Sequence, residues 1–216
     1  NNHSMSGFLP LFIDLCDQKV VIIGGGSVGE RKAALFGRYA KTVVASFEFT
    51  ERLMGLEDIE LITMDEKLDD DEFTKLIEDA FLMIPATDDS AYNEHLSAIA
   101  SRHGVLVNRV DDLGDVIIPS VIARGDVVIG ISTLAHSPAL SRYIRGRIEE
   151  VITPAYADMA RLQSEVREYL KGRIPDQGTR QQVLWAILED ETVWEYLRTS
   201  YEQAFGQAML HCEDVI

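Results

Sequence analysis

A glycine-rich turn directly after a short apolar run is the feature that most limits what this chain can fold into. The run Lys19–Ile23 stops at Gly24, and Gly26 and Gly29 follow in the spacing G-x-G-x-x-G. A helix-compatible stretch, residues 30–39, comes next. A buried strand, a tight turn and a helix in this order form the context of a dinucleotide-binding turn. The sequence therefore predicts an α/β domain with a nucleotide site at this turn.

The chemistry of such a turn comes from its backbone. Gly24 permits the sharp turn, Gly26 lets a pyrophosphate approach the main chain because it has no Cβ, and Gly29 lets the helix pack close to the strand. Free N–H groups at the helix start, where Ser27 and Val28 stand, and the positive end of the helix dipole would face the phosphates. The alternative is a glycine-rich turn without a ligand, as in other α/β proteins.

The rest of the chain predicts a parallel sheet, then a hairpin, then helices. Strands are expected at 41–45, 59–63, 81–84 and 105–108, with helices at 70–79 and 90–103; strands that alternate with helices in this way form parallel sheets. Residues 116–123 and 127–133 predict a hairpin. Helices are expected at 138–152, 154–170, 179–190 and 191–205. We expect a Rossmann-like domain over 5–112, a hairpin-and-helix dimerisation module over 113–152 and a helical domain over 153–216.

Charge and composition exclude several classes of protein. The net charge of -16 argues against a nucleic-acid binder. The chain has no apolar run of about 18 residues, so no membrane span is expected. Its two cysteines lie far apart without metal-type spacing and are expected as free thiols in a reducing compartment. We therefore expect a cytoplasmic protein without a bound metal, a membrane partner or a nucleic-acid partner.

Two loops that follow strands are candidates for cofactor contacts. In dinucleotide sites an acid about 20 residues after the glycines binds the ribose hydroxyls. Ser46 stands just after the second strand and Glu48 slightly beyond, while no arginine directly follows the strand, which favours NAD over NADP. Thr87 and Asp88 follow the fourth strand on the same sheet edge and are expected to line the dinucleotide; a simple helix cap is the alternative.

The segment Asn108–Asp112 ends the next strand at that edge. An aspartate there, beside the nicotinamide, can serve as a general base. Two adjacent acids in extended chain point in opposite directions, so one would face the cleft and the other would face away. On pattern alone, a solvated turn is the favoured interpretation of this segment.

Several short motifs, in this order and spacing, resemble the precorrin-2 dehydrogenase family. They cover about residues 8–150 and are Phe8–Phe12, Gly24–Ala33, Ala86–Asp89 with Asn93, Asn108–Asp111, Ile118–Ser120, Ile131–Thr133 and Ser137–Pro138. The resemblance implies NAD-dependent oxidation of precorrin-2 to sirohydrochlorin, and in some members insertion of ferrous iron as well. It also implies a homodimer that exchanges its hairpin strands and the helices that follow them.

The resemblance also implies roles for particular residues. The single essential aspartate of the family matches Asp111, which reverses the preference for a solvated turn. The tetrapyrrole substrate carries many carboxylates, so Arg109, Arg142 and Arg145 are expected to bind them. Further substrate contacts are expected from Ser132, His136 and Ser137. Asn108 is expected at the cofactor.

The chain departs from the family pattern in the segment before Pro119, which lacks the phenylalanine often found there, and in one loop. Relatives usually carry glycine before the Ser137–Pro138 pair, whereas this chain has Leu134-Ala135-His136. We expect no attached tetrapyrrole methyltransferase domain. Two other functions stay open, a non-catalytic NAD-sensing module and a chelatase without redox activity.

Overall fold

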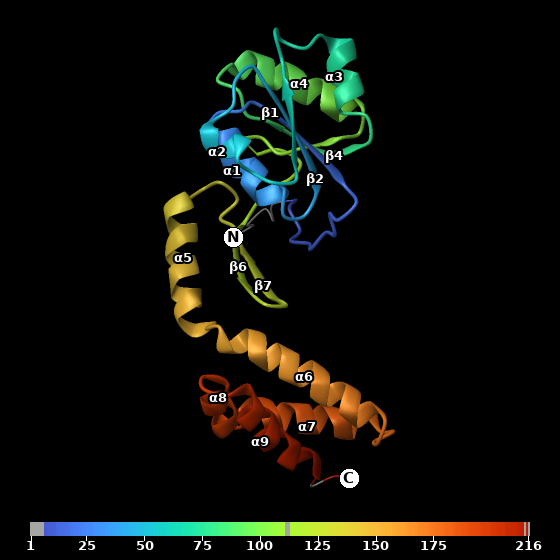
Figure 1. Ribbon diagram of the computed structural model, residues 1–216, viewed down its shortest axis with the longest axis vertical. Helices are drawn as coiled ribbons and strands as arrows, with labels where there is room; N and C mark the ends of the chain where they lie inside the picture. Colours follow the sequence, from blue (N-terminus) through green and yellow to red (C-terminus); the bar gives the residue numbers. More distant parts are fainter. Residues whose placement is uncertain (1–6, 111–112, 214, 216) are drawn as a thin grey trace, which may run out of the picture. The chain divides into compact units, whose positions relative to one another are not determined.

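The computed structural model describes residues 7–110, 113–213 and 215 (Figure 1). They form two compact units, which divide between Ile118 and Pro119. Each unit is described by itself below. The expected division into three domains stays a prediction.

The N-terminal unit is built on a parallel sheet of five strands. These are β1 (Lys19–Ile23), β2 (Lys41–Ser46), β3 (Ile59–Thr63), β4 (Ala80–Pro85) and β5 (Leu106–Val107), in the order β3-β2-β1-β4-β5. The expected Rossmann-like sheet is thereby confirmed. The chain runs outward from β1 to β2 and β3, then returns to the other side of β1 as β4. Open α/β sheets bind ligands outside the carboxyl ends of the strands at such a reversal, which here lies between β1 and β4.

Helices cover both faces of this sheet because the strands are apolar on both sides. Val20 and Ile22 of β1 pack with α1 (Ser27–Phe36) and α2 (Glu51–Met54), whose Ala33, Phe36 and Leu53 are buried in the same cluster. Val21 and Ile23 point the other way, as neighbouring strand residues do, and pack with α3 (Asp70–Leu76) and α4 (Ser90–Arg102). The sheet therefore lies between two helical layers (Figure 1).

The C-terminal unit begins with the expected hairpin. Strand β6 (Ser120–Arg124) pairs antiparallel with β7 (Val127–Ile131), and Gly125 takes a φ of +58° in the turn between them. Helix α5 (Pro138–Val151) follows. Ser137 caps it by accepting a hydrogen bond from the backbone N–H of Leu140.

Four helices then bury a separate apolar core. They are α6 (Ala155–Lys171), α7 (Gln177–Glu189), α8 (Glu191–Leu197) and α9 (Tyr201–Glu213). The core includes Leu162, Val166, Ile187 and Ala208, each with no exposed surface. No residue of α5 is buried, in contrast to these helices.

Three sequence expectations about boundaries were wrong. The single helix expected over 191–205 is two helices, because the Ser200 hydroxyl accepts from the N–H of Gln203 and starts a new helix. The strand expected from 116 begins only at Ser120, since the N–H of Val116 bonds instead to the carbonyl of Val107, at 3.3 Å. Helix α1 begins at Ser27 rather than at residue 30, immediately after the turn.

Candidate functional site

The three glycines of the turn differ in the space around them: backbone atoms lie close to Gly24 and Gly29, whereas the space beside Gly26 is open. Gly24 has a φ of +121°, and a Cβ there would lie 2.4 Å from the carbonyl oxygen of Ala86. A Cβ on Gly29 would lie 1.9 Å from the carbonyl oxygen of Gly24, so α1 packs directly on the end of β1. Around the Cβ position of Gly26 no described neighbour outside the adjoining residues lies within 4 Å. The open space is therefore where a pyrophosphate approaches the main chain in dinucleotide sites.

Backbone N–H groups at the start of α1 are available to such a ligand. Gly26 is the N-cap and offers no side-chain acceptor, and the N–H of Glu30 bonds to its carbonyl at 2.9 Å. Among the described residues, no protein acceptor takes a hydrogen bond from the N–H groups of Ser27, Val28 or Gly29. N–H groups at a helix start, together with the helix dipole, favour an anion.

Ser46 holds the shape of the turn. Its side chain is buried, and its hydroxyl accepts a hydrogen bond of 2.8 Å from the backbone N–H of Gly25. The carbonyl of Gly25 in turn accepts from the N–H of Thr50, at 3.1 Å. The end of β2 and the loop that follows it are thus tied to the glycine turn. A cofactor contact from Ser46 itself stays a prediction.

Glu48 lies exposed on this same loop. A Cβ on Gly25 would lie 2.2 Å from the Glu48 carbonyl oxygen, so the loop backbone lies against the turn while the carboxylate faces solvent. Arg52, the nearest arginine after β2, lies 3.6 Å from the carboxylate of Glu30. Glu48 is therefore placed beside the turn on the β2 side, where the ribose acid of an NAD site stands.

Thr87 is fixed by Asn93 on α4. The Asn93 side-chain oxygen accepts from the hydroxyl of Thr87 at 2.6 Å and from its N–H at 3.2 Å, and the Asn93 amide donates to the Thr87 carbonyl at 2.8 Å. Asp88 is exposed between Thr87 and the helix. The loop after β4 is consequently rigid and lies next to the glycine turn, since the N–H of Ala86 bonds to the carbonyl of Ile23. Asn93 was part of the family resemblance but was not expected as a site residue.

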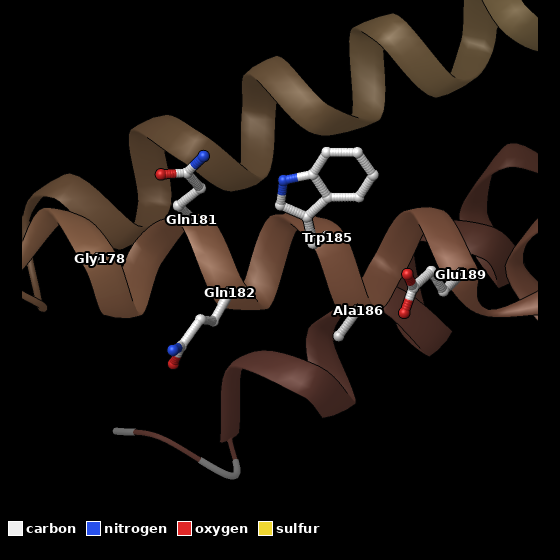
Figure 2. A pocket seen from close by; sticks show the side chains of 6 residues that line it. All are labelled: Gly178, Gln181, Gln182, Trp185, Ala186 and Glu189. Carbon is white, nitrogen blue, oxygen red and sulfur yellow. The ribbon is translucent and has the colours of Figure 1, made fainter.

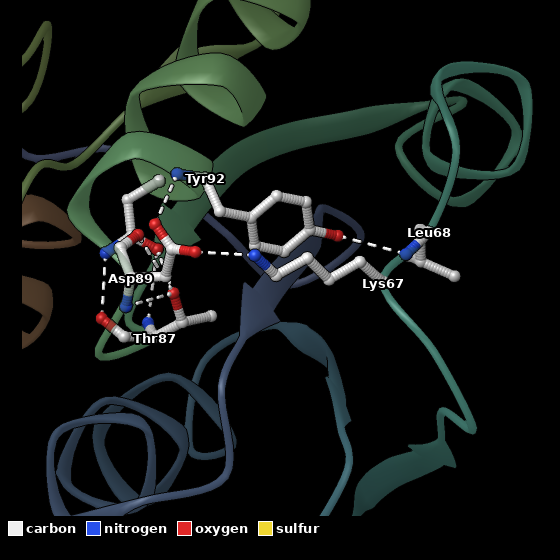
Figure 3. Close-up of polar contacts among 6 residues, drawn as sticks. Lys67, Leu68, Thr87, Asp89 and Tyr92 are labelled. Atoms are coloured by element: carbon white, nitrogen blue, oxygen red, sulfur yellow. Dashed lines mark hydrogen bonds and ion pairs between the residues drawn. The ribbon is translucent and has the colours of Figure 1, made fainter.

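Asp89 is the helix cap that the sequence suggested for this loop. One carboxylate oxygen accepts from the N–H of Tyr92 at 3.0 Å, and the other lies 2.5 Å from the ammonium of Lys67 (Figure 3). The hydrogen bond from Lys67, with that from Tyr92, lowers the pKa of Asp89 below its ordinary value. The Tyr92 hydroxyl accepts from the N–H of Leu68, so the cap also joins α4 to the segment before α3. The helix-cap interpretation of this loop is thus correct, and cofactor contacts from Thr87 and Asp88 stay predictions.

Asn108 lies at the carboxyl end of β5 and is held on three sides. Its N–H donates to the carbonyl of Met83 at 3.0 Å, and its side-chain amide donates to the carbonyl of Val116 at 2.8 Å. Its side-chain oxygen accepts from the ammonium of Lys32 at 2.9 Å. Only 5% of Asn108 is exposed. The residue therefore positions Lys32, which lies within the Gly24–Ala33 motif of the family resemblance but was not among the expected site residues.

The ammonium of Lys32 is perturbed by its surroundings. Burial lowers its pKa, and the positive charge of neighbouring Arg31 lowers it further, to about 8. Lys32 stands four residues after Val28, which places both on one face of α1. That spacing is the signal in the sequence that connects it to the glycine turn.

Arg109 and Asp111 continue this segment. The guanidinium of Arg109 lies 2.5 Å from the carboxylate of Glu94 on α4. Asp111, the expected catalytic residue, lies outside the described residues. Its role stays a prediction, as does substrate binding by Arg109.

The expected substrate residues of the C-terminal unit gather at the start of α5. The Ser132 hydroxyl accepts from the N–H of Leu134, and the Ser137 N–H donates to the hydroxyl of Thr133 at 3.1 Å. Thr133 also donates to the Ser137 carbonyl at 2.9 Å and lies 3.0 Å from the Ser141 hydroxyl, so it organises the loop. The sequence motif contained Thr133, but its role was not expected.

The departure from the family pattern has a clear structural consequence in this loop. Leu134 and Ala135 have φ values of +51° and +63°, in the left-handed region that favours glycine. His136 follows, its N–H bonded to the Thr133 carbonyl at 3.0 Å. Two consecutive non-glycine residues in this region mark strain, which is common where a loop serves a function.

The two arginines expected at the substrate lie on α5. Arg142 is exposed, and among the described residues it forms no ion pair. Arg145 lies 3.2 Å from Glu149 one turn later. Arg124 of β6 lies 3.9 Å from the same carboxylate. Arg142 is thus the more available cation of the two.

One hollow lies in the C-terminal unit, on α7. It is lined by Gly178, Gln181, Gln182, Trp185, Ala186 and Glu189, all on one helix (Figure 2). The described residues contain no group of three or more His, Cys, Asp or Glu side chains arranged to hold a metal ion. Nor does any helix among residues 7–110, 113–213 and 215 have the length and apolar character that a membrane span requires.

Comparison with known proteins agrees with this geometry. A family model described as putative NAD(P)-binding matches residues 11–120, which include the glycine turn and Asn108. A precorrin-2 dehydrogenase of Methanosarcina barkeri is 51% identical over 207 residues, covering 94% of this chain and 92% of that protein. A siroheme synthase of Methylococcus capsulatus is 37% identical over 188 residues; the match covers 84% of this chain but only 38% of the synthase.

A solved structure shares the fold. The precorrin-2 dehydrogenase SirC superposes with a TM-score of 0.72 at 19% identity, and the match covers 94% of this chain and 100% of that one. At this identity the likeness concerns architecture alone. The match to the Methanosarcina barkeri protein over nearly the whole length of both chains decides the relationship, and the chain belongs to the precorrin-2 dehydrogenase family.

Proposed function

We propose that this protein is an NAD-dependent precorrin-2 dehydrogenase, which oxidises precorrin-2 to sirohydrochlorin. The observation that carries the proposal is the 51% identity to the Methanosarcina barkeri precorrin-2 dehydrogenase over 94% of the chain. The glycine turn supports the cofactor half, because it offers open space at Gly26 beside unpaired N–H groups. When bound there, NAD+ supplies a hydride acceptor.

The proposed reaction removes two electrons and two hydrogens from the macrocycle. One hydrogen leaves with both electrons as hydride and reduces NAD+ to NADH, and the other leaves as a proton. A base must take that proton, and the family resemblance assigns this role to Asp111. Asn108, three residues earlier, is buried and firmly held at the carboxyl end of β5, which supports a fixed start for this segment.

The cofactor contacts of the proposal divide between the two sides of the turn. Gly24, Gly26, Ser27, Val28 and Gly29 would face the pyrophosphate. Ser46 and Glu48 stand on the β2 side, where the adenosine ribose binds in this fold. Thr87, Asp88 and Asn108 stand on the β4 and β5 side and would line the nicotinamide half. The exposed carboxylate of Glu48 supports NAD over NADP, because it would repel a 2′-phosphate.

Substrate contacts are proposed for basic and hydroxyl side chains. Arg109, Arg142 and Arg145 would bind carboxylates of the tetrapyrrole, and Ser132, His136 and Ser137 would complete the contacts. The exposure of Arg142, which forms no ion pair with the part of the chain that the structure describes, supports its part of this proposal. Arg109 and Arg145 would have to share their guanidinium groups with Glu94 and Glu149.

The proposal includes a homodimer in the cytoplasm. The exposed apolar residues of the hairpin and α5 support the dimer, since a helix without a buried residue leaves apolar surface to be covered. They are Val128, Leu140, Tyr143 and Val151, which are 41%, 48%, 67% and 64% exposed. Cytoplasmic location and the lack of a nucleic-acid or membrane partner stay predictions.

An anaerobic assay with matched aspartate variants tests the proposed chemistry. Wild type should form NADH from precorrin-2 and NAD+, and Asp111→Asn should lower kcat by at least about 100-fold, the scale of one general base. Asp112→Asn, which changes the adjacent acid, should keep kcat within a few-fold. Equal rates for wild type and Asp111→Asn would remove Asp111 from the mechanism.

The same assay separates the other functions. Binding of NAD+ without turnover would indicate a sensing module. Insertion of Fe²⁺ or Co²⁺ into sirohydrochlorin without dehydrogenation would indicate a chelatase that lacks redox activity. Ferrous iron insertion in addition to oxidation stays a prediction, to be tested by adding Fe²⁺ to the completed reaction.

A further inference from the structure

Lys32 is a half-buried cation whose one described acceptor is a neutral amide. Its ammonium donates to the side-chain oxygen of Asn108 at 2.9 Å. An ammonium has three donors, so this contact leaves two without a described protein acceptor. The orientation of the Asn108 amide is fixed, because its nitrogen donates to the Val116 carbonyl. The structure thus holds the ammonium in one place without satisfying it.

Lys32 combines partial burial with the lack of a described carboxylate partner. The net charge is -16. Among the described residues of the N-terminal unit, Lys41, Arg52, Lys67 and Arg109 have acids within 4 Å, and the arginines and lysines without one are exposed (Arg31, Arg38, Lys75 and Arg102) or, as for Lys19, bonded to a backbone carbonyl. No described carboxylate lies within that distance of Lys32. A cation that is removed from water without a counter-ion costs free energy, and such an arrangement is typical of a group that awaits an anionic ligand.

The position of Lys32 in the sheet indicates which ligand this is. The glycine turn ends β1, and the β2 side of it carries Ser46 and Glu48. Asn108 ends β5, which lies beyond β4 on the opposite side of the reversal. In this fold the adenosine half extends toward the β2 side and the nicotinamide half toward the other. Lys32, held by Asn108, therefore lies on the side of the turn where the nicotinamide and the reacting macrocycle would lie.

We propose that Lys32 anchors the substrate, its ammonium binding a carboxylate of the tetrapyrrole, and that Asn108 positions it for that contact. The inference rests on the proposed function, because that function supplies the polycarboxylate ligand. It adds a substrate-binding residue from the dinucleotide-binding helix α1 itself. A phosphate of the dinucleotide is the other anionic group that could reach this ammonium, and the experiment below separates the two.

The charged groups around α1 leave the ammonium available. Arg31, adjacent on the helix, repels it. The nearby acids have other partners or face solvent: Glu30 contacts Thr50 and Arg52, Asp115 accepts from the N–H of Val107, and Glu51 is exposed on α2. Lys19 and Lys41 lie at the amino ends of β1 and β2, at the other end of the strands from the glycine turn. Asp111 and Asp112 lie outside the described residues.

The lowered pKa of about 8 gives the contact a pH signature. Below this value the free protein carries the charge that binds a carboxylate. As pH rises through it, the ammonium loses its proton, and substrate affinity should fall while NAD+ affinity is unchanged. An arginine at this position stays charged at all these pH values and should abolish the fall.

The test compares Lys32→Gln and Lys32→Arg with Arg38→Gln, which removes an exposed cation just beyond the same helix. Sirohydrochlorin and NAD+ are titrated separately into each protein, and precorrin-2 turnover is measured. Lys32→Gln should raise the sirohydrochlorin Kd and the precorrin-2 KM about tenfold, as for loss of one charge-assisted hydrogen bond. The NAD+ Kd and kcat should change by less than about threefold, a difference too small to represent a lost ion contact. Lys32→Arg should restore most of the affinity and remove its fall above pH 8.

The outcomes decide between the alternatives. A weaker NAD+ Kd with an unchanged sirohydrochlorin Kd would overturn the proposal and assign Lys32 to a phosphate. Unchanged values for both ligands would also overturn it and leave Lys32 with a structural role. If wild type neither binds sirohydrochlorin nor oxidises precorrin-2, the proposed function itself fails, and this inference fails with it. Turnover by wild type with a normal KM in Lys32→Gln would contradict the inference alone.

Discussion

The backbone N–H of Gly25 donates a hydrogen bond of 2.8 Å to the hydroxyl of Ser46, and this contact fixes the shape of the glycine turn. It joins the middle of the turn to the last residue of β2. Because the Ser46 side chain is buried, water cannot take the place of its hydroxyl as the acceptor for the N–H of Gly25. The contact is therefore structural support for the cofactor site whether or not Ser46 touches the cofactor.

Replacing Ser46 with alanine should weaken both folding and cofactor binding. Loss of the hydroxyl leaves a buried N–H unpaired, which costs about 1–3 kcal/mol of unfolding free energy. The looser turn should raise the NAD+ Kd several-fold. Urea unfolding and NAD+ titration of Ser46→Ala measure both effects, with Ser101→Ala, an exposed serine of α4, as the control. Unchanged unfolding of Ser46→Ala would show that the hydrogen bond contributes nothing.

Gly26 should be replaceable without loss of stability but not without loss of the cofactor. A Cβ there meets no described atom beyond its neighbours within 4 Å, and the φ of -76° suits alanine. The added methyl would occupy the space for the pyrophosphate, so Gly26→Ala should unfold at the wild-type temperature and bind NAD+ at least about tenfold more weakly, the effect of roughly 1.4 kcal/mol. Gly206→Ala on α9, where a Cβ also meets nothing, is the control and should leave NAD+ binding unaltered. Wild-type affinity in Gly26→Ala would place the phosphates elsewhere.

Replacing Ala135 with glycine should destabilise the protein less than replacing an alanine within a helix. Its φ of +63° costs an L-residue about 1 kcal/mol that glycine does not pay. Glycine loses about 0.5–1 kcal/mol through the greater entropy of its unfolded chain. Ala135→Gly should therefore be nearly neutral in thermal unfolding, whereas Ala186→Gly within α7 should lose about 1 kcal/mol. Equal losses in the two variants would show that the loop before α5 is not strained.

Asp190 should make the C-terminal unit sensitive to acid. Burial raises its pKa, but hydrogen bonds from His211, Gln207 and the backbone of the α8 start outweigh this and hold the pKa at about 2. Because this value lies below that of the unfolded chain, the carboxylate stabilises the fold above about pH 4, and the stabilisation is lost as pH falls toward 2. Asp190→Asn should be less stable at neutral pH, by about 1 kcal/mol. It should also lose less stability than wild type between pH 4 and 2, and a parallel acid dependence of the two proteins would contradict this assignment.

The sequence predicted the turn well because its information is local. The spacing of Gly24, Gly26 and Gly29 alone specifies a sharp turn, an open approach and a close helix, and each glycine has the expected surroundings. The alternation of apolar runs with helical stretches likewise predicted the parallel sheet. Such patterns depend on contacts within a few residues, which a sequence shows directly.

Contacts between distant residues could not be predicted in this way. Lys32 and Asn108 are separated by 76 positions, and only the packing of α1 near the end of β5 brings them together. Ser46 was expected at the cofactor, and the sequence contained no sign that its hydroxyl also accepts a hydrogen bond from the N–H of Gly25, 21 positions earlier. The sequence did not indicate the hydrogen bonds between Thr133 and Ser137, because they require the left-handed backbone of the loop between these residues.

The helix expected over 191–205 failed for a related reason. Most of its residues favour helix, and the one local signal of a new helix, Ser200 followed by Gln203 three residues later, was not used in the prediction. The break at Ser200 arises because α8 and α9 must fold against each other over the core of the unit, and Ser200 then caps the second helix. Helix propensity describes one segment at a time and contains no information about such packing.

Hydride transfer from precorrin-2 to NAD+ by this chain can be tested by the stoichiometry of one anaerobic reaction. Purified protein, precorrin-2 and NAD+ are mixed without oxygen, and NADH and sirohydrochlorin are measured together over time. We expect one NADH for each sirohydrochlorin formed, and Gly26→Ala should slow the formation of both equally. Sirohydrochlorin without NADH, or no product while a known precorrin-2 dehydrogenase turns over beside it, would contradict the claim.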